Sequence, residues 1–323
     1  MGDPPGRPRV PCGAGPLTVS SGAERHVAVT HFRVFGRGSR GGNPCPIVDD
    51  SGGLPADDMQ DIAARLGEES GFVSCDDDGW RFRFFMPRRE APMCVHATVA
   101  ATTALVRKRR VARSGEMSVR TESGPCRVRW DDRRPPRVTV EQQPPRFGDP
   151  AHVAGSIERA LGLGRGAIDG TQPIRSVSVS TPKLMVPLRT PDDVHRVDPE
   201  LDALWKLCAD LGTTGAYVFA PLPGAGVGHF VARQFPVGGG FREDPATGVA
   251  AGALAAYVAD RAESATSTWI AIEIDQGDAM GYPCTLHAAA YVEAGEIART
   301  TVTGSASFVG EARMSLSAGT TWR

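Results

Sequence analysis

The chain has 323 residues, enough for one large domain or for two lobes with cores of their own. Hydrophobic residues make up 41% and charged residues 23%, and the formal net charge is −1, so nothing suggests a nucleic-acid partner. No stretch approaches the roughly 18 apolar residues of a membrane helix, and the seven cysteines form no CxxC pair or Cys/His cluster at metal-ligand spacing. We expect a cytoplasmic protein without a structural metal, bound to neither nucleic acid nor membrane.

The apolar patterns predict a tail followed by a first lobe. Residues 1–26 are rich in Pro, Gly and Arg and are expected to form a disordered tail. Alternating apolar residues then predict strands at 27–35, 45–49, 72–74, 80–86, 117–122, 126–130 and 137–141. Helical spacing predicts helices at 54–66 and 98–106. These elements define a first lobe, residues 27–145, to which a C-terminal strand at about 305–323 is expected to return.

A second lobe is predicted over residues 146–304, after the consecutive prolines Pro144 and Pro145. Its helices are expected at 153–161, 199–211 and 249–260. Its strands are expected at 176–180, 216–220, 228–235, 271–274, 285–292 and 300–308.

An internal repeat links the two lobes. The segment Arg89-Glu-Ala-Pro-Met-Cys-Val-His-Ala97 aligns with Arg242-Glu-Asp-Pro-Ala-Thr-Gly-Val-Ala250, and Arg, Glu, Pro and the last Ala coincide at a constant offset of 153 residues. Each segment runs into an Ala-rich helix without a polar face, which predicts a buried helix. We interpret the two segments as copies of one strand–loop–helix unit.

Two such helices could build one site. Their N-termini carry unpaired N–H groups and partial positive charge, and two lobes related by a pseudo-twofold axis would direct both into one cleft. A small carboxylate could then be bound by backbone amides. Cys94 and Thr247 occupy equivalent positions in the repeat, with His96 and Asp244 within one turn. A helix N-terminus also predicts a lowered pKa for Cys94.

The motifs resemble a known family. Gly42-Asn43-Pro44, Glu69-Ser-Gly-Phe-Val73, Glu90-Ala-Pro-Met-Cys-Val-His96, Glu243-Asp-Pro-Ala-Thr-Gly248 and Gln276-Gly277 occur in this order. Together they resemble the phenazine-biosynthesis (PhzF-like) isomerases of the diaminopimelate-epimerase and proline-racemase superfamily, over residues 27–310. The resemblance implies an α+β, two-lobed diaminopimelate-epimerase-like fold. In that fold each lobe is a mostly antiparallel sheet around a central buried helix, and the active site lies in the cleft between the lobes.

The resemblance also implies roles for individual residues. Glu69, His96 and Asp244 match acid/base positions of a proton-shift reaction that needs neither a metal nor an organic cofactor, and Cys94 is a further catalytic candidate. The implied substrate is a small cyclic unsaturated amino acid, such as a dihydroaromatic or alkylproline precursor, in secondary-metabolite (antibiotic) biosynthesis. The implied assembly is a homodimer. The substrate-binding candidates are Thr247, Gly248, Val95, Ala97, Gln276 and Gly277.

Departures from the family pattern keep alternatives open. Val95, Ala97 and Val249 depart from the PhzF pattern, which argues for a different substrate. Pairing of Cys94 with Thr247 resembles the superfamily's hydroxyproline dehydratases, so the first alternative is a one-base dehydratase or epimerase of a proline-like amino acid that uses Cys94. The second is a non-catalytic carboxylate-binding protein on the same scaffold.

Overall fold

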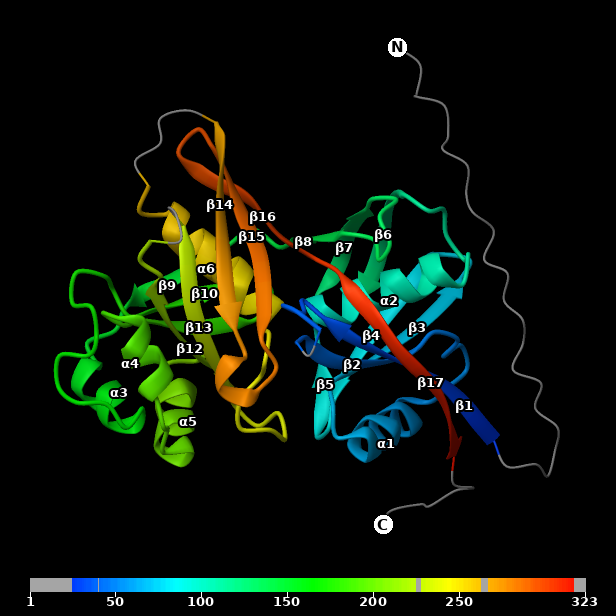
Figure 1. Cartoon of the computed structure of the whole chain (residues 1–323), viewed down its shortest axis with the longest axis horizontal. Helices are drawn as coiled ribbons and strands as arrows, with labels where there is room; N and C mark the ends of the chain where they lie inside the picture. The colour runs from blue at the N-terminus through cyan, green and yellow to red at the C-terminus, as the bar shows by residue number, and fades with distance from the viewer. Residues whose placement is uncertain (1–24, 40, 225–227, 263–266, 317–323) are drawn as a thin grey trace.

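The computed structural model describes residues 25–39, 41–224, 228–262 and 267–316, which form two lobes side by side (Figure 1). The tail expected over residues 1–26 lies outside these ranges except for its last two residues, which begin the first strand. None of the described helices is long and apolar enough to cross a membrane.

Lobe 1 is a curved sheet in the order β17-β1-β2-β3-β4-β6-β7-β8, with β5 beside β4. The pairs β2–β3 and β4–β6 are parallel and the others are antiparallel. Helix α1 (Ala56–Leu66) packs outside this sheet. The strands are β1 (Arg25–Val34), β2 (Asn43–Val48), β3 (Ser70–Asp76), β4 (Gly79–Met86), β5 (Arg89–Ala91), β6 (Gly115–Thr121), β7 (Gly124–Trp130), β8 (Val138–Gln142) and β17 (Ala306–Leu316).

Lobe 2 repeats the design in the order β9-β10-β11-β12-β13-β14-β15-β16, with β11–β12 and β13–β14 parallel. Strand β16 also pairs with β8, so the sheets of the two lobes are hydrogen-bonded to each other. The strands are β9 (Arg146–Pro150), β10 (Arg175–Ser178), β11 (Pro182–Pro187), β12 (Gly215–Pro221), β13 (His229–Pro236), β14 (Thr268–Gln276), β15 (Cys284–Glu293) and β16 (Glu296–Gly304). The expected α+β class, with mostly antiparallel sheets, is confirmed.

Each sheet encloses one apolar helix. In α2 (Val95–Arg107) the residues from Val95 to Leu105 are all buried, and in α6 (Gly248–Ala259) only Val258 is not. Threonine hydroxyls in α2 would be costly to bury unpaired, and they donate to carbonyls four residues back, as Thr102 does to Thr98 O at 2.8 Å. The two buried helices expected from the Ala-rich segments are confirmed.

The sequence patterns missed three short strands and one short α-helix, as well as the 3₁₀ helix Asp278–Met280. Strand β11 begins and ends at proline, which argues against a strand. Strands β5 and β9 are only three and five residues long. The strand expected over 300–308 is two strands separated at Ser305, because the chain leaves lobe 2 there and pairs with β1 of lobe 1.

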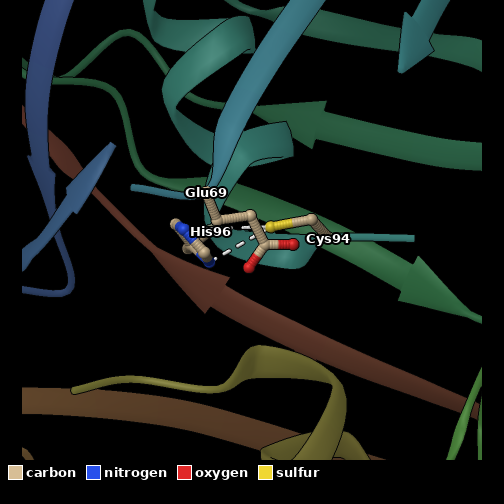
Figure 2. Close-up of side chains that lie close together, drawn as sticks. All are labelled: Glu69, Cys94 and His96. Atoms are coloured by element: carbon tan, nitrogen blue, oxygen red, sulfur yellow. Dashed lines mark hydrogen bonds between the residues drawn. The ribbon is translucent and has the colours of Figure 1, made fainter. Parts of the chain in front are cut away.

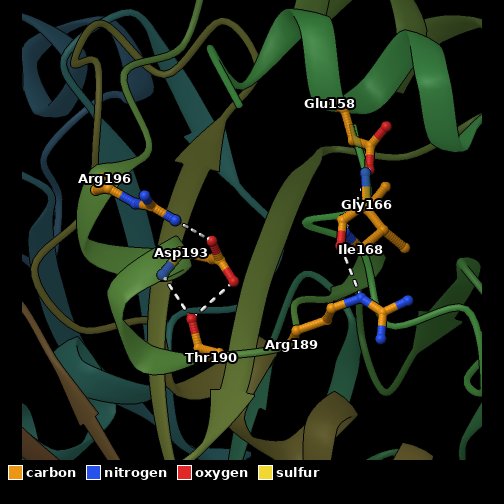
Figure 3. A network of polar contacts seen from close by, with 7 residues as sticks. All are labelled: Glu158, Gly166, Ile168, Arg189, Thr190, Asp193 and Arg196. Carbon is orange, nitrogen blue, oxygen red and sulfur yellow. Dashed lines mark hydrogen bonds and ion pairs between the residues drawn. The ribbon is translucent and has the colours of Figure 1, made fainter. Parts of the chain in front are cut away.

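The fourth missed element is α4 (Pro191–Arg196), which with α3 (Ala154–Ala160) and α5 (Leu201–Asp210) covers the outer face of lobe 2. Thr190 caps α4 by accepting from the N–H of Asp193 at 3.1 Å (Figure 3). That Thr-Pro-Asp-Asp spacing is a capping signal that the sequence contains. Beside α4, the carboxylate of Glu158 accepts from the N–H of Gly166 at 2.7 Å, which fixes the loop after α3.

Arginine–glutamate pairs support the internal repeat. In lobe 1 the guanidinium of Arg83 binds both carboxylate oxygens of Glu90, at 2.8 and 2.7 Å. In lobe 2 Arg233 binds Glu243 in the same two-pronged way, at 2.9 and 2.7 Å. Bidentate pairs of this kind are geometrically specific. The glutamate of each repeat copy is therefore held by an arginine of the strand before it, which positions the loop leading to each buried helix.

Candidate functional site

The N-termini of α2 and α6 meet at a cavity of about 140 Å³. Its volume is below the roughly 300–1,000 Å³ of common ligand pockets, so it suits a small molecule. A second cavity of about 220 Å³ shares Glu69, His96, Phe241 and Asp244 with it. The candidates that line the first cavity are Glu69, Cys94, Val95, His96, Asp244, Thr247 and Gly248.

Three titratable side chains cluster at the lobe 1 side of this cavity. Glu69 lies between α1 and β3, Cys94 is the N-cap of α2 and His96 lies in its first turn. One ligand-type atom of each lies within 4.8 Å of the other two, and Figure 2 shows all three side chains facing one another. Cys94 Sγ contacts His96 Nδ1 at 3.1 Å. The fold therefore joins Glu69 to residues about 25 positions later in the sequence.

Burial shifts the pKa values of Glu69 and His96 in opposite directions. It raises the pKa of Glu69 above its ordinary value, although the nearby His96 opposes the shift. Burial lowers the pKa of His96, which Glu69 in turn opposes. The two pKa values are thus displaced toward each other, which reduces the free-energy difference between a proton on Glu69 and a proton on His96. Groups that titrate near the working pH are the ones suited to take up and return a proton.

The expected lowering of the Cys94 pKa is wrong. Burial raises the pKa of this thiol well above its usual value, and the negative charge of Glu69 raises it further. The N–H of Ala97 donates to Cys94 Sγ at 3.4 Å and works in the opposite direction, but it does not compensate for lost hydration. Cys94 is therefore a neutral thiol in the resting site.

Asp244 lies on the lobe 2 side of the cavity. Asn43 Nδ2 donates to Asp244 Oδ1 at 2.7 Å, and the hydroxyl of Thr247 donates to Oδ2. Burial raises the pKa of Asp244 to about 6, although these hydrogen bonds favour the ionised form. Asn43 belongs to β2 and also donates to Ala246 O at 3.0 Å. It is a site residue that spacing alone did not identify, although it is part of the quoted Gly42-Asn43-Pro44 motif.

Three predicted substrate-binding residues do not line either cavity. The backbone N–H of Ala97 donates to Cys94 Sγ and so does not face the cavity as a free donor. Gln276 is buried and supports the Asp244–Thr247 loop from behind, with its Nε2 donating to Asp244 O at 2.7 Å. Gly277 has a φ of 87°, and a Cβ there would lie 2.7 Å from Pro245 O. Gln276 and Gly277 thus have supporting positions, one layer away from the cavity.

Val95 and Gly248 are in direct contact across the pseudo-twofold axis. A Cβ on Gly248 would lie 2.5 Å from the Cβ of Val95. Gly248 is therefore required because Val95 fills the space between the two helix N-termini, where the sequence led us to expect a bound carboxylate.

This contact predicts energetic coupling. Gly248→Ala is expected to lower the free energy of unfolding by about 1–3 kcal/mol through overpacking, and Val95→Gly by about 2–4 kcal/mol through loss of a buried side chain and of helix propensity. The double variant should be more stable than the sum of the two losses, by at least about 0.5 kcal/mol in urea denaturation. Simple additivity would show that the helix N-termini are not packed together.

Comparisons with known proteins identify the family and the fold. A family model described as phenazine biosynthesis-like protein (PhzC-PhzF) matches residues 32–312. An uncharacterized isomerase of Deinococcus radiodurans is 33% identical over 242 residues, 73% of this chain and 76% of that protein. A PhzF-family phenazine biosynthesis protein of Bacillus anthracis superposes with a TM-score of 0.82 at 24% identity, covering 90% of this chain and 100% of that one.

A second solved structure is similar at lower sequence identity. It is a hydroxyproline epimerase from Agrobacterium vitis with bound trans-4-hydroxy-L-proline, similar with a TM-score of 0.63 at 13% identity, over 90% of this chain and 93% of that one. At such identities the two structural matches show the fold alone, and that fold is the two-lobed one expected from the sequence.

Proposed function

Because the chain belongs to the phenazine biosynthesis-like (PhzC-PhzF) family, we propose that it is a cofactor-independent isomerase that moves a proton within a small cyclic unsaturated amino acid. The observation that carries the proposal is the convergence of Glu69, His96 and Asp244 on one small cavity. Two of the three are acids whose pKa burial raises, and the third is a base whose pKa burial lowers. The relatives' names support an isomerase without identifying its substrate.

In the proposed reaction, ionised Glu69 takes a proton from a ring carbon next to a double bond. The electron pair of the broken C–H bond forms a new C=C bond, and the electrons of the old double bond take up a proton at its far carbon. The proton on Glu69 is returned to that carbon, either directly or through His96, which passes on one proton for each one it receives, so atoms and charge balance. The N-termini of α2 and α6 stabilise the negative charge that develops between the two steps, and Asp244 holds a polar group of the substrate.

The Cys94-dependent dehydratase or epimerase is the second candidate. Its support is the position of Cys94 at the N-cap of α2, 3.1 Å from His96, and the epimerase among the structural matches. The raised pKa of Cys94 disfavours it, since a thiol is a weak base. A non-catalytic carboxylate-binding protein is the remaining alternative.

The wider setting forms part of this proposal. We infer a homodimeric, cytoplasmic enzyme of secondary metabolism from the family resemblance and the sequence composition. We also propose that residues 27–145, completed by the C-terminal strand, and residues 146–304 act as the two halves of the site.

Proton NMR in D2O tests the proposed function. The purified chain is incubated with a panel of cyclic amino acids that includes dihydroaromatic acids, dehydroprolines and hydroxyprolines. Double-bond migration with deuterium at the newly protonated carbon supports the isomerase. Deuterium only at the α-carbon with inversion supports the epimerase, loss of water supports the dehydratase, and calorimetric binding without any turnover supports the binding protein.

Metal sensitivity gives a further prediction. Glu69, Cys94 and His96 offer oxygen, sulfur and nitrogen ligands, a set that suits Zn²⁺. A bound zinc ion would engage the carboxylate that must accept the proton. We therefore expect added ZnCl2 to inhibit turnover and EDTA to leave it unchanged. Loss of turnover in EDTA and its recovery with Zn²⁺ would instead establish a metalloenzyme.

A further inference from the structure

Lys183 is a buried cation that the proposed reaction does not use. It lies on β11, is 8% exposed and lines the same cavity as Glu69 and Asp244. Its Nζ donates to Thr214 Oγ1 at 2.9 Å, and no carboxylate of the described residues lies within ion-pair distance. The other two lysines of the chain do have such partners: Lys108 pairs with Asp49 at 2.9 Å and Lys206 with Asp210 at 2.8 Å.

Gln234, on β13, lines the same cavity as Lys183 and has unused hydrogen-bonding capacity. It is 1% exposed, and neither polar atom of its amide has a hydrogen-bond partner among the described residues. Its backbone carbonyl accepts from the N–H of Asp244 at 3.1 Å, so it is tied to the site. Leaving a buried polar atom unpaired costs about 1–3 kcal/mol. A ligand that accepts from this amide would recover that cost.

A second cation, from lobe 1, lines the same cavity as Lys183 and Gln234. Arg89, on β5, is exposed, and its guanidinium donates to the carbonyl of Val237 at 3.3 Å without an ion-pair partner in the described ranges. Burial lowers the pKa of Lys183 to about 8 and the charge of Arg89 adds to this, while Asp244 and Glu69, which line the same cavity, and Cys208 favour the charged form. A buried ammonium that makes no direct ion pair is stabilised by an anion that hydrogen-bonds to it.

The helix N-termini are poorly suited to be the main anion site. Val95 lies against Gly248 in the space between them. The N–H of Ala97 already donates to Cys94 Sγ, and the N–H of Thr247 donates to Gln276 Oε1 at 3.4 Å. Lys183 and Gln234, which also line the cavity, offer side-chain donors that the protein leaves free.

We propose that Lys183, Gln234 and Arg89 form an anion subsite that binds the carboxylate of the substrate, with the reacting carbon directed toward Glu69 and His96. The inference rests on the proposed function and narrows its substrate class to amino acids whose carboxylate lies on the far side of the ring from the migrating proton. Because Arg89 belongs to lobe 1 and Lys183 to lobe 2, the bound carboxylate also links the two lobes.

Calorimetric titration with three carboxylates tests the subsite independently of turnover. Each probe is compared with a counterpart that lacks the carboxylate charge. Anthranilate is compared with aniline, benzoate with benzyl alcohol, and L-proline with prolinamide. We expect at least one carboxylate to bind at least tenfold more tightly than its counterpart. Lys183→Met should abolish that preference, Lys183→Arg should retain part of it, and Lys206→Met, a surface control, should retain all of it.

The pH dependence provides a second readout. The carboxylate affinity of the wild-type chain should fall as pH rises through about 8, where Lys183 loses its proton, and this fall should be absent in Lys183→Met. Equal carboxylate preference in wild type and in folded Lys183→Met would overturn the subsite, as would the absence of any preference in the wild type. Glu69→Gln separates the two proposals, because it should lose turnover and keep carboxylate binding.

Discussion

Glu69→Gln is expected to reduce kcat by about 10²–10⁴-fold, the contribution of a positioned general base. The amide keeps the size and most of the packing of the carboxyl group but cannot accept the proton. The protein should remain folded, because Glu69 lies in a connection between α1 and β3 and not inside an element. Rates are measured on whichever substrate the NMR panel identifies, with the thermal melting temperature as the check on folding.

Glu311→Gln is the matched control for this variant, since Glu311 is exposed on β17 and lines neither cavity of the candidate site. Its kcat should equal that of the wild type. The pH profile gives a second check on Glu69. Burial raises the pKa of Glu69 above 4.5, the ordinary value of a glutamate, so wild-type kcat/KM should rise with pH and its midpoint should lie above 4.5. A Glu69→Gln variant that turns over at the wild-type rate would exclude Glu69 as the base.

Asp244→Asn is expected to abolish most turnover and yet to stabilise the fold at alkaline pH. The pKa of Asp244 is about 6 in the folded state against an ordinary value of 3.8, so the folded state binds more protons between these values. By linkage, this group makes the protein less stable as pH rises from about 4 to 6, and the cost persists above that range. One pKa unit corresponds to about 1.4 kcal/mol. The uncharged amide escapes this cost.

The free energy of unfolding should therefore increase by about 1–3 kcal/mol at pH 8 in Asp244→Asn. A weaker hydrogen bond from Asn43 to the amide reduces this gain. The gain should vanish near pH 4, where the wild-type carboxyl is also neutral. Urea denaturation at the two pH values measures both quantities, and Asp210→Asn, at an exposed site, is the control. A variant that is less stable than wild type at pH 8 would show that the hydrogen bonds to Asp244 outweigh its burial.

The parts of the fold that sequence predicted best are those with an unambiguous local pattern. The segments that became α2 and α6 are Ala-rich and have no charged or continuous polar face, which predicts a buried helix. Strand β11 is the opposite case. Its residues after Pro182 are all buried, but the prolines at its two ends are unfavourable in strands, so no strand was predicted there. Lys183 lies in that strand, and so the cation of the proposed anion subsite was missed together with its element.

The site was partly predictable for a similar reason. The repeat correctly placed Cys94 and Thr247 at equivalent helix N-caps, because it is a local feature that duplicates with the chain. The protonation of Cys94 was predicted with the wrong sign, since a helix N-terminus is visible in sequence and the burial of a thiol beside Glu69 is not. The unpaired amide of Gln234 likewise arises from packing against segments distant in sequence, which no spacing rule reports.

The most direct test of Glu69 as the base compares deuterium wash-in from D2O by wild type, Glu69→Gln and Cys94→Ser, followed by proton NMR on the same substrate. We expect Cys94→Ser still to move the double bond and incorporate deuterium, and Glu69→Gln to do neither. Loss of exchange in Cys94→Ser with full activity in Glu69→Gln would contradict it and identify the chain as a thiol-dependent enzyme of the proline-racemase type.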